Sequence, residues 1–201
     1  MRIAIATLSL SLLPLGACQR IKEPVPTPTT DQWRRVQESL IDTLPETAQR
    51  LDAQLGDHVR LVGWEIEPAA PQLSGEVALT LYWETTAPIE DRWRIFVHLD
   101  QQGARQNLDH EAVNNVYATV YWEPGKIIVD RVEGTLSGDL RVGEVSVLVG
   151  MFRDDPRLSD QDRRMAVTQP GTATVESDGR LRIGAFNVAW EPPRYAARFA
   201  A

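Results

Sequence analysis

The sequence predicts a mainly β protein, an antiparallel β-sandwich of the immunoglobulin-like or jelly-roll-like kind with an N-terminal helical segment. Apolar residues alternate with smaller or more polar ones over 77–83 and again over 93–99, which is typical of half-buried strands. We expect these two strands to form an antiparallel pair whose apolar face is covered by a second sheet. Similar runs recur about every ten residues after Asp57 without a helical pattern between them, as in sandwiches.

Composition supports one globular domain with a hydrophobic core. The chain has 201 residues, of which 43% are hydrophobic and 24% are charged, values that are ordinary for globular proteins. The formal net charge is -7 without a basic stripe, which argues against a nucleic-acid partner and against electrostatic binding to an anionic membrane. A single cysteine excludes an intrachain disulfide.

Residues 1–17 have the pattern of a signal peptide. Arg2 is followed by an apolar stretch over 3–13, too short for a permanent membrane-spanning helix. The next residues, Leu15-Gly16-Ala17-Cys18, resemble the lipobox of bacterial lipoproteins. In that family the chain is cut before the cysteine and the thiol is acylated, so the resemblance makes Cys18 the lipid attachment residue. The alternative is an ordinary secretory signal with a chance cysteine.

The residue after the cysteine bears on localisation. It is Gln19 and not Asp, and in enterobacterial lipoproteins Asp at this place resembles an inner-membrane retention signal. We therefore expect a lipid-anchored protein of the bacterial cell envelope, at the outer membrane and facing the periplasm. The membrane is its expected partner, and the N-terminal lipid attaches the protein to it.

Two segments separate Cys18 from the sandwich. Residues 18–30 contain three alternating prolines, which favour an extended tether. Over 31–56 apolar residues recur at spacings of three or four, which predicts an amphipathic helix or helix pair interrupted at Pro45. This helical segment packs on the sandwich in one interpretation and binds a partner in the other.

The sandwich itself is assigned to residues 57–190, followed by a C-terminal tail over 191–201. Asp178-Gly179 between two alternating runs predicts a tight hairpin. The polar stretch over 100–115 is expected to be a loop. The expected strands cover 58–67, 75–83, 92–99, 126–132, 143–152, 172–176 and 180–188.

Short sequence blocks within residues 59–167 keep one order. They are Leu81-Tyr82-Trp83, Phe96-Val97-His98-Leu99, Asp109, Trp122-Glu123-Pro124-Gly125 with Asp130, and Val147-Leu148-Val149-Gly150-Met151-Phe152. Together they resemble an uncharacterised extracytoplasmic β-sandwich domain of bacterial lipoproteins, which is also appended to membrane glycosyltransferases of the mannosyltransferase type. The resemblance implies a fold and a compartment, and it suggests a subunit that supports envelope glycan synthesis or export as one hypothesis.

Catalytic patterns are weak. His98 shares a strand face with Arg94 and Phe96, and a lone strand histidine is usually a hydrogen-bonded structural residue. Asp130 interrupts an apolar strand, so we expect it to accept hydrogen bonds from backbone or arginine. The sequence contains no nucleophile elbow, phosphate loop or His-Glu-x-x-His motif. We predict a non-catalytic protein; the alternative is a periplasmic hydrolase or lyase that uses His98, Asp109 and Asp130.

The ligand hypothesis rests on aromatic residues. Tyr121 and Trp122 precede the Pro124-Gly125 turn, where exposed rings could stack on sugars, with Asp109 and His98 as further candidate contacts. Core packing is the alternative for most of the six tryptophans. The acidic loop over 154–164 also contains arginines, which favours mutual neutralisation over a Ca²⁺ site, so no metal or cofactor is predicted. The expected function is a lipid-anchored envelope protein with a binding or structural β-sandwich, whose ligand is an envelope glycan or a protein partner.

Overall fold

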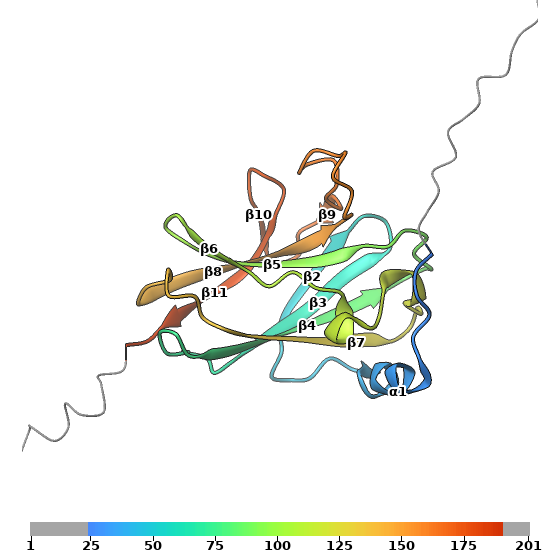
Figure 1. Ribbon diagram of the computed structural model, residues 1–201, viewed down its shortest axis with the longest axis horizontal. Coiled ribbons are helices and arrows are strands. Elements are labelled where there is room, and N and C mark those ends of the chain that lie inside the picture. Colours follow the sequence, from blue (N-terminus) through green and yellow to red (C-terminus); the bar gives the residue numbers. More distant parts are fainter. Residues whose placement is uncertain (1–23, 191–201) are drawn as a thin grey trace, which may run out of the picture.

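Two antiparallel sheets face each other in the computed structural model, which describes residues 24–190 (Figure 1). The first sheet has the order β1 (Leu40–Ile41), β7 (Ile127–Thr135), β4 (Glu76–Thr85), β3 (Val59–Glu67), β2 (Gln49–Leu55) and β9 (Val167–Gln169). The second has the order β10 (Thr174–Val175), β11 (Leu181–Val188), β8 (Gly143–Phe152), β5 (Arg94–Gln101) and β6 (Ala104–Asn107). The predicted mainly β sandwich with an N-terminal helix is confirmed.

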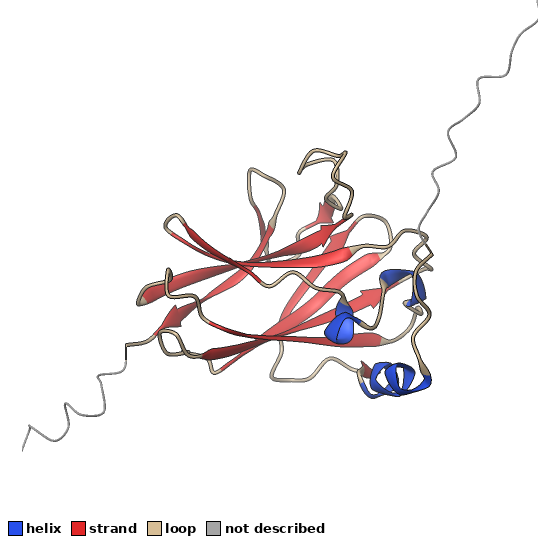
Figure 2. Ribbon diagram, in the orientation of Figure 1, coloured by secondary structure: helices blue, strands red, loops and turns tan. Residues whose placement is uncertain are grey.

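Three short helical segments accompany the sheets. They are α1 (Thr30–Glu38), α2 (Ala112–Asn115) and the 3₁₀ turn η1 (Thr119–Tyr121), all on the right-hand half of Figure 2. A capping box begins α1, since the Thr29 hydroxyl accepts from the Gln32 N–H and the Gln32 side chain accepts from the Thr29 N–H. Val36 of α1 is fully buried, so the helix packs on the sandwich.

The helical prediction for residues 31–56 is wrong beyond Glu38. Residues 49–55 form strand β2, in which Leu51, Ala53 and Leu55 alternate towards the core. A register shift near Asp52, whose φ is 59°, separates the two parts of the β2–β3 pairing. Pairing with β3 therefore overrides the helical spacing, which arises from a loop followed by a strand.

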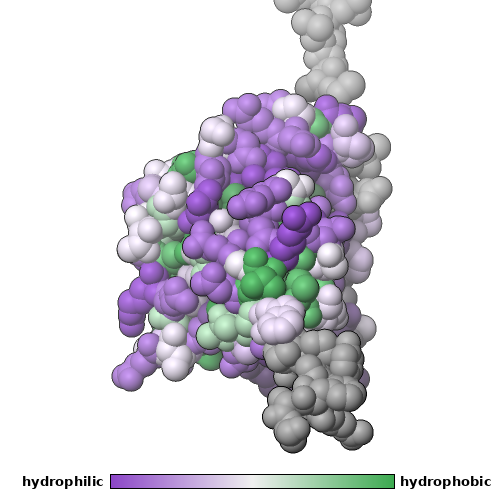
Figure 3. All heavy atoms as spheres, turned by 90° about the vertical axis from the view of Figure 1, so that its left-hand side faces the viewer, coloured by the Kyte–Doolittle hydropathy of each residue, from purple (hydrophilic) through white to green (hydrophobic). Residues whose placement is uncertain are grey.

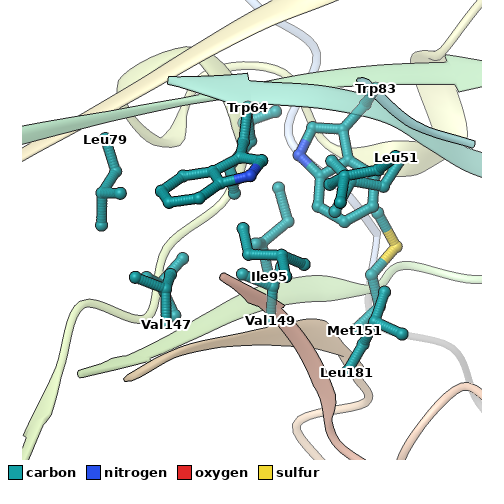
Figure 4. Packing of buried hydrophobic residues seen from close by; sticks show 14 of the residues in the cluster. Leu51, Trp64, Leu79, Trp83, Ile95, Val147, Val149, Met151 and Leu181 are labelled. Atoms are coloured by element: carbon teal, nitrogen blue, oxygen red, sulfur yellow. The ribbon is translucent and has the colours of Figure 1, made fainter. Parts of the chain in front are cut away.

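The expected pairing of the 77–83 and 93–99 strands is also wrong. These strands are β4 and β5, and they belong to different sheets, because the chain crosses from one layer to the other between Thr85 and Arg94. Their apolar faces meet across the core instead of lying side by side. In Figure 4, Trp64 and Trp83 of the first sheet pack over Val147 and Val149 of the second.

The predicted Asp178-Gly179 hairpin is confirmed. Val175 of β10 pairs with Leu181 of β11, and Gly179 has a φ of 81°, a conformation that glycine adopts readily. The sheets end in short edge strands: β1, β9, β10 and β6 have two, three, two and four residues.

The first described residues of the expected tether lie against the sandwich. Pro28 is buried, and the Tyr121 hydroxyl donates to the Val25 carbonyl at 2.9 Å. The described chain enters at the right of Figure 1 and ends at the left. Within residues 24–190 no helix is both long and apolar enough to cross a bilayer. The predicted signal peptide, Cys18 and the tail over 191–201 lie outside the described residues.

Candidate functional site

The three residues of the hydrolase hypothesis occupy two different places. His98 lies on the outer face of β5, where its Nε2 is 3.6 Å from Asp109 Oδ1. Asp130 points inwards from β7 in the other sheet and has no solvent exposure. One of its oxygens is 2.8 Å from His110 Nε2, and the other accepts from the Val113 N–H at 3.0 Å. The expected backbone hydrogen bond to Asp130 is present, and His98 is not its partner.

Of the two residues expected to form an aromatic platform, Trp122 is buried and Tyr121 is half-buried. Trp122 is 2% exposed, and its Nε1 donates to the Tyr117 carbonyl at 3.0 Å. Tyr121 is half-buried against Trp33, with ring centroids 6.0 Å apart, and its hydroxyl is bound to Val25. The exposure expected for Trp122 is wrong, because η1 turns this apolar run towards the core.

The outer face of the second sheet carries a different polar group, centred on Arg180. This residue follows the Gly179 turn, and its side chain is 10% exposed. Its Nε donates to Asp178 Oδ2 at 2.7 Å, and its Nη1 donates to Asp100 Oδ2 at 2.8 Å. The same Nη1 is 3.3 Å from His98 Nδ1. Since a guanidinium only donates, His98 Nδ1 accepts, and the ring proton is on Nε2.

Two carboxylates stabilise the buried guanidinium. Burial raises the pKa of Asp100, but hydrogen bonds from Arg105 and Arg180 lower it further, so this pKa lies below its ordinary value. Burial also raises the pKa of Asp178, while the backbone and side chain of Arg180 lower it by more. Both carboxylates are therefore ionised at neutral pH, and they offset the desolvation of Arg180.

A surface trough opens over this network. It consists of two adjoining depressions of ≈ 630 Å³ and ≈ 390 Å³ that share Asp100, residues 101–104 and Ser146. The larger one is bounded by the β5–β6 turn and by residues of 139–144; the smaller one reaches Arg180 and Arg182 beside the β10–β11 hairpin. Ser146 and Leu148 of β8 line it between the two hairpins. We call this surface the trough.

The trough presents charged and neutral hydrogen-bonding groups together. Arg105 binds Asp100 through both Nε and Nη2, at 2.8 and 3.0 Å, and Arg182 Nε is 2.7 Å from Glu176 Oε1. These pairs hold the guanidinium and carboxylate groups in place at the rim. The arrangement suits a ligand that both donates and accepts hydrogen bonds.

The end of the sandwich that carries the β5–β6 turn is viewed in Figure 3. Polar residues cover most of the visible surface, and hydrophobic residues gather beside the grey atoms at the bottom. The exposed large hydrophobic side chains include Leu73, Val142 and Trp190, at 40%, 51% and 63%. Leu73 N–H donates to the Ala189 carbonyl, so Leu73 and Trp190 belong to one region.

A second groove of ≈ 670 Å³ lies where residues 24–29 join the sandwich, and Val25 lines it. Its arginines are engaged: Arg94 pairs with Asp154 at 3.3 Å and Arg153 with Asp91 at 3.6 Å. The loop over 154–164 likewise shows the predicted neutralisation, since Arg157 binds Asp155 and Arg163 binds Asp160. In the part of the chain that the structure describes, no group of three or more His, Cys, Asp or Glu could hold a metal ion.

Sequence reasoning found His98 and Asp109 but missed Arg180. Arg180 meets Asp100 and His98 from about eighty positions along the chain, and an arginine at a strand start carries no distinctive local pattern. Comparisons of the chain with protein-family models, curated proteins and solved structures found no match. The resemblance to the lipoprotein and glycosyltransferase-associated domain therefore stays a prediction.

Proposed function

We propose that the chain is a lipid-anchored protein of the bacterial cell envelope whose β-sandwich binds an envelope glycan in the trough without catalysing a reaction. The observation that carries this proposal is the lining of the trough. Carboxylates, guanidinium groups, side-chain amides and the Ser146 hydroxyl meet there in one elongated depression. Sugar hydroxyls both donate and accept, so a mixed set of fixed donors and acceptors is the chemistry that recognises them.

The position of the trough supports a tethered binding protein. The lipobox resemblance puts the lipid at Cys18, and the chain joins the sandwich at the end opposite the β5–β6 turn (Figure 1). A trough at the far end would face away from the lipid surface and towards envelope polymers. Cytosolic function is disfavoured by the same leader sequence.

The hydrogen bonds of His98 argue against the hydrolase or lyase alternative. A general base needs a free lone pair within reach of substrate. Nδ1 of His98 already faces Arg180 Nη1 at 3.3 Å, and Nε2 faces Asp109 at 3.6 Å. Asp130 binds His110 and Val113 inside the core, so it cannot assist His98.

A protein partner is the second candidate. The exposed Leu73 and Trp190 favour it, because neighbouring exposed apolar residues often mark protein interaction sites. A role in envelope glycan synthesis or export would need such a contact as well as glycan binding.

The binding proposal is tested by filling the trough. Ser146→Trp places a large side chain on its floor, and Gln49→Trp places the same side chain on an exposed position of β2 in the other sheet. We expect the full-length protein to be retarded by an envelope polysaccharide fraction in affinity electrophoresis, Gln49→Trp to behave alike, and Ser146→Trp to lose retardation. Equal retardation of both variants, or none of the wild type, would refute glycan binding in the trough.

Anchoring is tested separately on protein isolated from the native host. We expect the mature N-terminal peptide to begin at Cys18 and to carry diacylglycerol in its mass spectrum. Two or more acyl chains give stable anchoring at roughly 0.8 kcal/mol per buried CH₂. An unmodified Cys18 thiol would show that the anchor assignment is wrong.

A further inference from the structure

We infer that Arg180 is the subsite for a single carboxylate, so that the glycan bound in the trough is an acidic one built with uronic acid residues. This inference rests on the proposed function and names the chemical class of its ligand.

Arg180 has five N–H donors. Nε uses its one donor on Asp178, and Nη1 uses its two on Asp100 and His98. None of the hydrogen bonds found for Arg180 within residues 24–190 involves Nη2, whose two donors remain. The side chain is nine-tenths buried and lines the smaller depression of the trough.

A guanidinium group that is largely buried is a strong anion ligand. Inside protein the effective dielectric is lower than in water, so a hydrogen bond to an ionised acceptor is strengthened. Leu148, which is 2% exposed, lies in the same depression and keeps its floor apolar. Asp100 and Asp178 fix the rotamer of Arg180 before any ligand arrives, which lowers the entropic cost of binding.

Charge and donor number favour a monoanion. The smaller depression and its support carry three guanidinium groups and three carboxylates: Arg105, Arg180, Arg182, Asp100, Glu176 and Asp178. Because these six charges balance, the site has no surplus cation, so it tolerates the single charge of a carboxylate better than the two charges of a phosphate dianion, which would meet the neighbouring carboxylates without matching cations. The remaining Nη2 group can donate to one oxygen of such a carboxylate.

The rest of the trough suits the sugar ring that bears the carboxylate. Gln102 and Ser146 lie along the shared part of the two depressions, where their amide and hydroxyl groups can bind hydroxyls. The larger depression continues past the β5–β6 turn towards Asp139. A polymer chain could therefore run along the trough with one acidic residue over Arg180.

The test compares an acidic polysaccharide with its neutral counterpart. Polygalacturonate and the same polymer after carboxyl reduction are titrated calorimetrically into the full-length Cys18→Ser protein, which lacks the acyl group. Arg180→Lys keeps a cation between Asp100 and Asp178 but removes the Nη2 donors. Arg60→Lys is the matched control, because Arg60 pairs with Asp52 and Glu84 on the first sheet.

We expect polygalacturonate to bind at least about tenfold more tightly than the reduced polymer, and Arg180→Lys to lose about tenfold or more while Arg60→Lys loses none. If both polymers bind with equal affinity and Ser146→Trp abolishes their binding, the carboxylate subsite is overturned while glycan binding in the trough stands. If neither polymer binds but another envelope glycan retards the protein in electrophoresis, the carboxylate subsite is likewise overturned and glycan binding stands. Failure with every glycan would overturn both proposals.

Two further results would decide against the subsite. Tighter binding of a phosphate-bearing polymer would show that the site does not select a monoanion. If circular dichroism shows that Arg180→Lys does not fold, the comparison of the acidic and reduced polymers on the Cys18→Ser protein decides alone. A ratio of their two dissociation constants near one then refutes the inference.

Discussion

The substitution Asp130→Asn should lower the free energy of unfolding by about 3–5 kcal/mol, the range for removing one partner of a buried ion pair. His110 Nδ1 is 2.8 Å from the Leu108 carbonyl, and its Nε2 is 2.8 Å from Asp130 Oδ2. The Leu108 carbonyl and an ionised carboxylate only accept, so in the ionic form of this pair both ring nitrogens of His110 carry protons. Asp130 is its counter-ion and is completely buried.

The magnitude follows from the donors that face Asp130. Its carboxylate accepts from His110 and from the Val113 N–H. An amide has one acceptor oxygen, so the side chain introduced by Asp130→Asn can satisfy one donor and turns its NH₂ towards the other. An unsatisfied buried donor costs about 1–3 kcal/mol, and the loss of the charge beside His110 accounts for the rest. The pair joins the loop after β6 to β7 of the opposite sheet, so its loss loosens the sandwich.

Urea unfolding followed by tryptophan fluorescence at pH 6 measures the effect. Asp109→Asn is the matched control, since that carboxylate is 30% exposed and lies 3.6 Å from His98; we expect it to change stability by less than about 1 kcal/mol. A loss below about 1 kcal/mol for Asp130→Asn, or equal losses for the two variants, would refute the buried-pair argument.

The same pair predicts a pH dependence. Burial lowers the pKa of His110, but the hydrogen bond and charge of Asp130 outweigh it, so the pKa in the folded protein lies above 6.5. A raised pKa means that the stabilisation is fully present below the unfolded value and is lost as pH rises through the folded value. The difference between wild type and Asp130→Asn should therefore narrow from pH 6 to alkaline pH. A difference that grows with pH would contradict this sign.

Three further changes test the packing. Gly184→Ala should lower the free energy of unfolding by about 1–3 kcal/mol in urea, because a Cβ would overlap the Trp64 ring; an unchanged midpoint would contradict it. Tyr121→Phe removes the hydrogen bond to Val25 and should speed amide hydrogen exchange over 25–29, with about 0.5–1.5 kcal/mol lost; unaltered exchange would show that this contact is not needed. Asn114→Val should cost about 1–2 kcal/mol because its φ is 55°, while Asn114→Gly should be neutral or stabilising.

The sequence predicts most of the strands because their alternation reports which face is buried. It also predicts the outward position of His98 and the need of Asp130 for hydrogen bonds. The spacing of apolar residues does not distinguish a helix from a strand where both repeats fit it. Leu51 and Leu55, four residues apart, fit both, and only pairing with β3 decides between them. Sheet membership of β4 and β5 is likewise decided by contacts far along the chain.

The candidate site is harder to predict for the same reason. Arg180, Asp100 and Asp178 become one network only after β5 and β11 take positions on either side of β8. The Pro-Gly turn after Trp122 suggests an exposed ring, but a short 3₁₀ turn directs it inwards. Residue type and turn signals do not encode either outcome.

The brevity of β1, β9, β10 and β6 has a consequence for the membrane anchoring proposed above. Proteins tethered to one membrane meet copies of themselves at a high effective concentration, and a long unpaired strand would then recruit a neighbouring chain into a shared sheet. Edge strands of two to four residues offer too few backbone groups for that recruitment. If the protein is lipid-anchored as proposed, a sandwich with such edges can be displayed densely and its copies still remain separate.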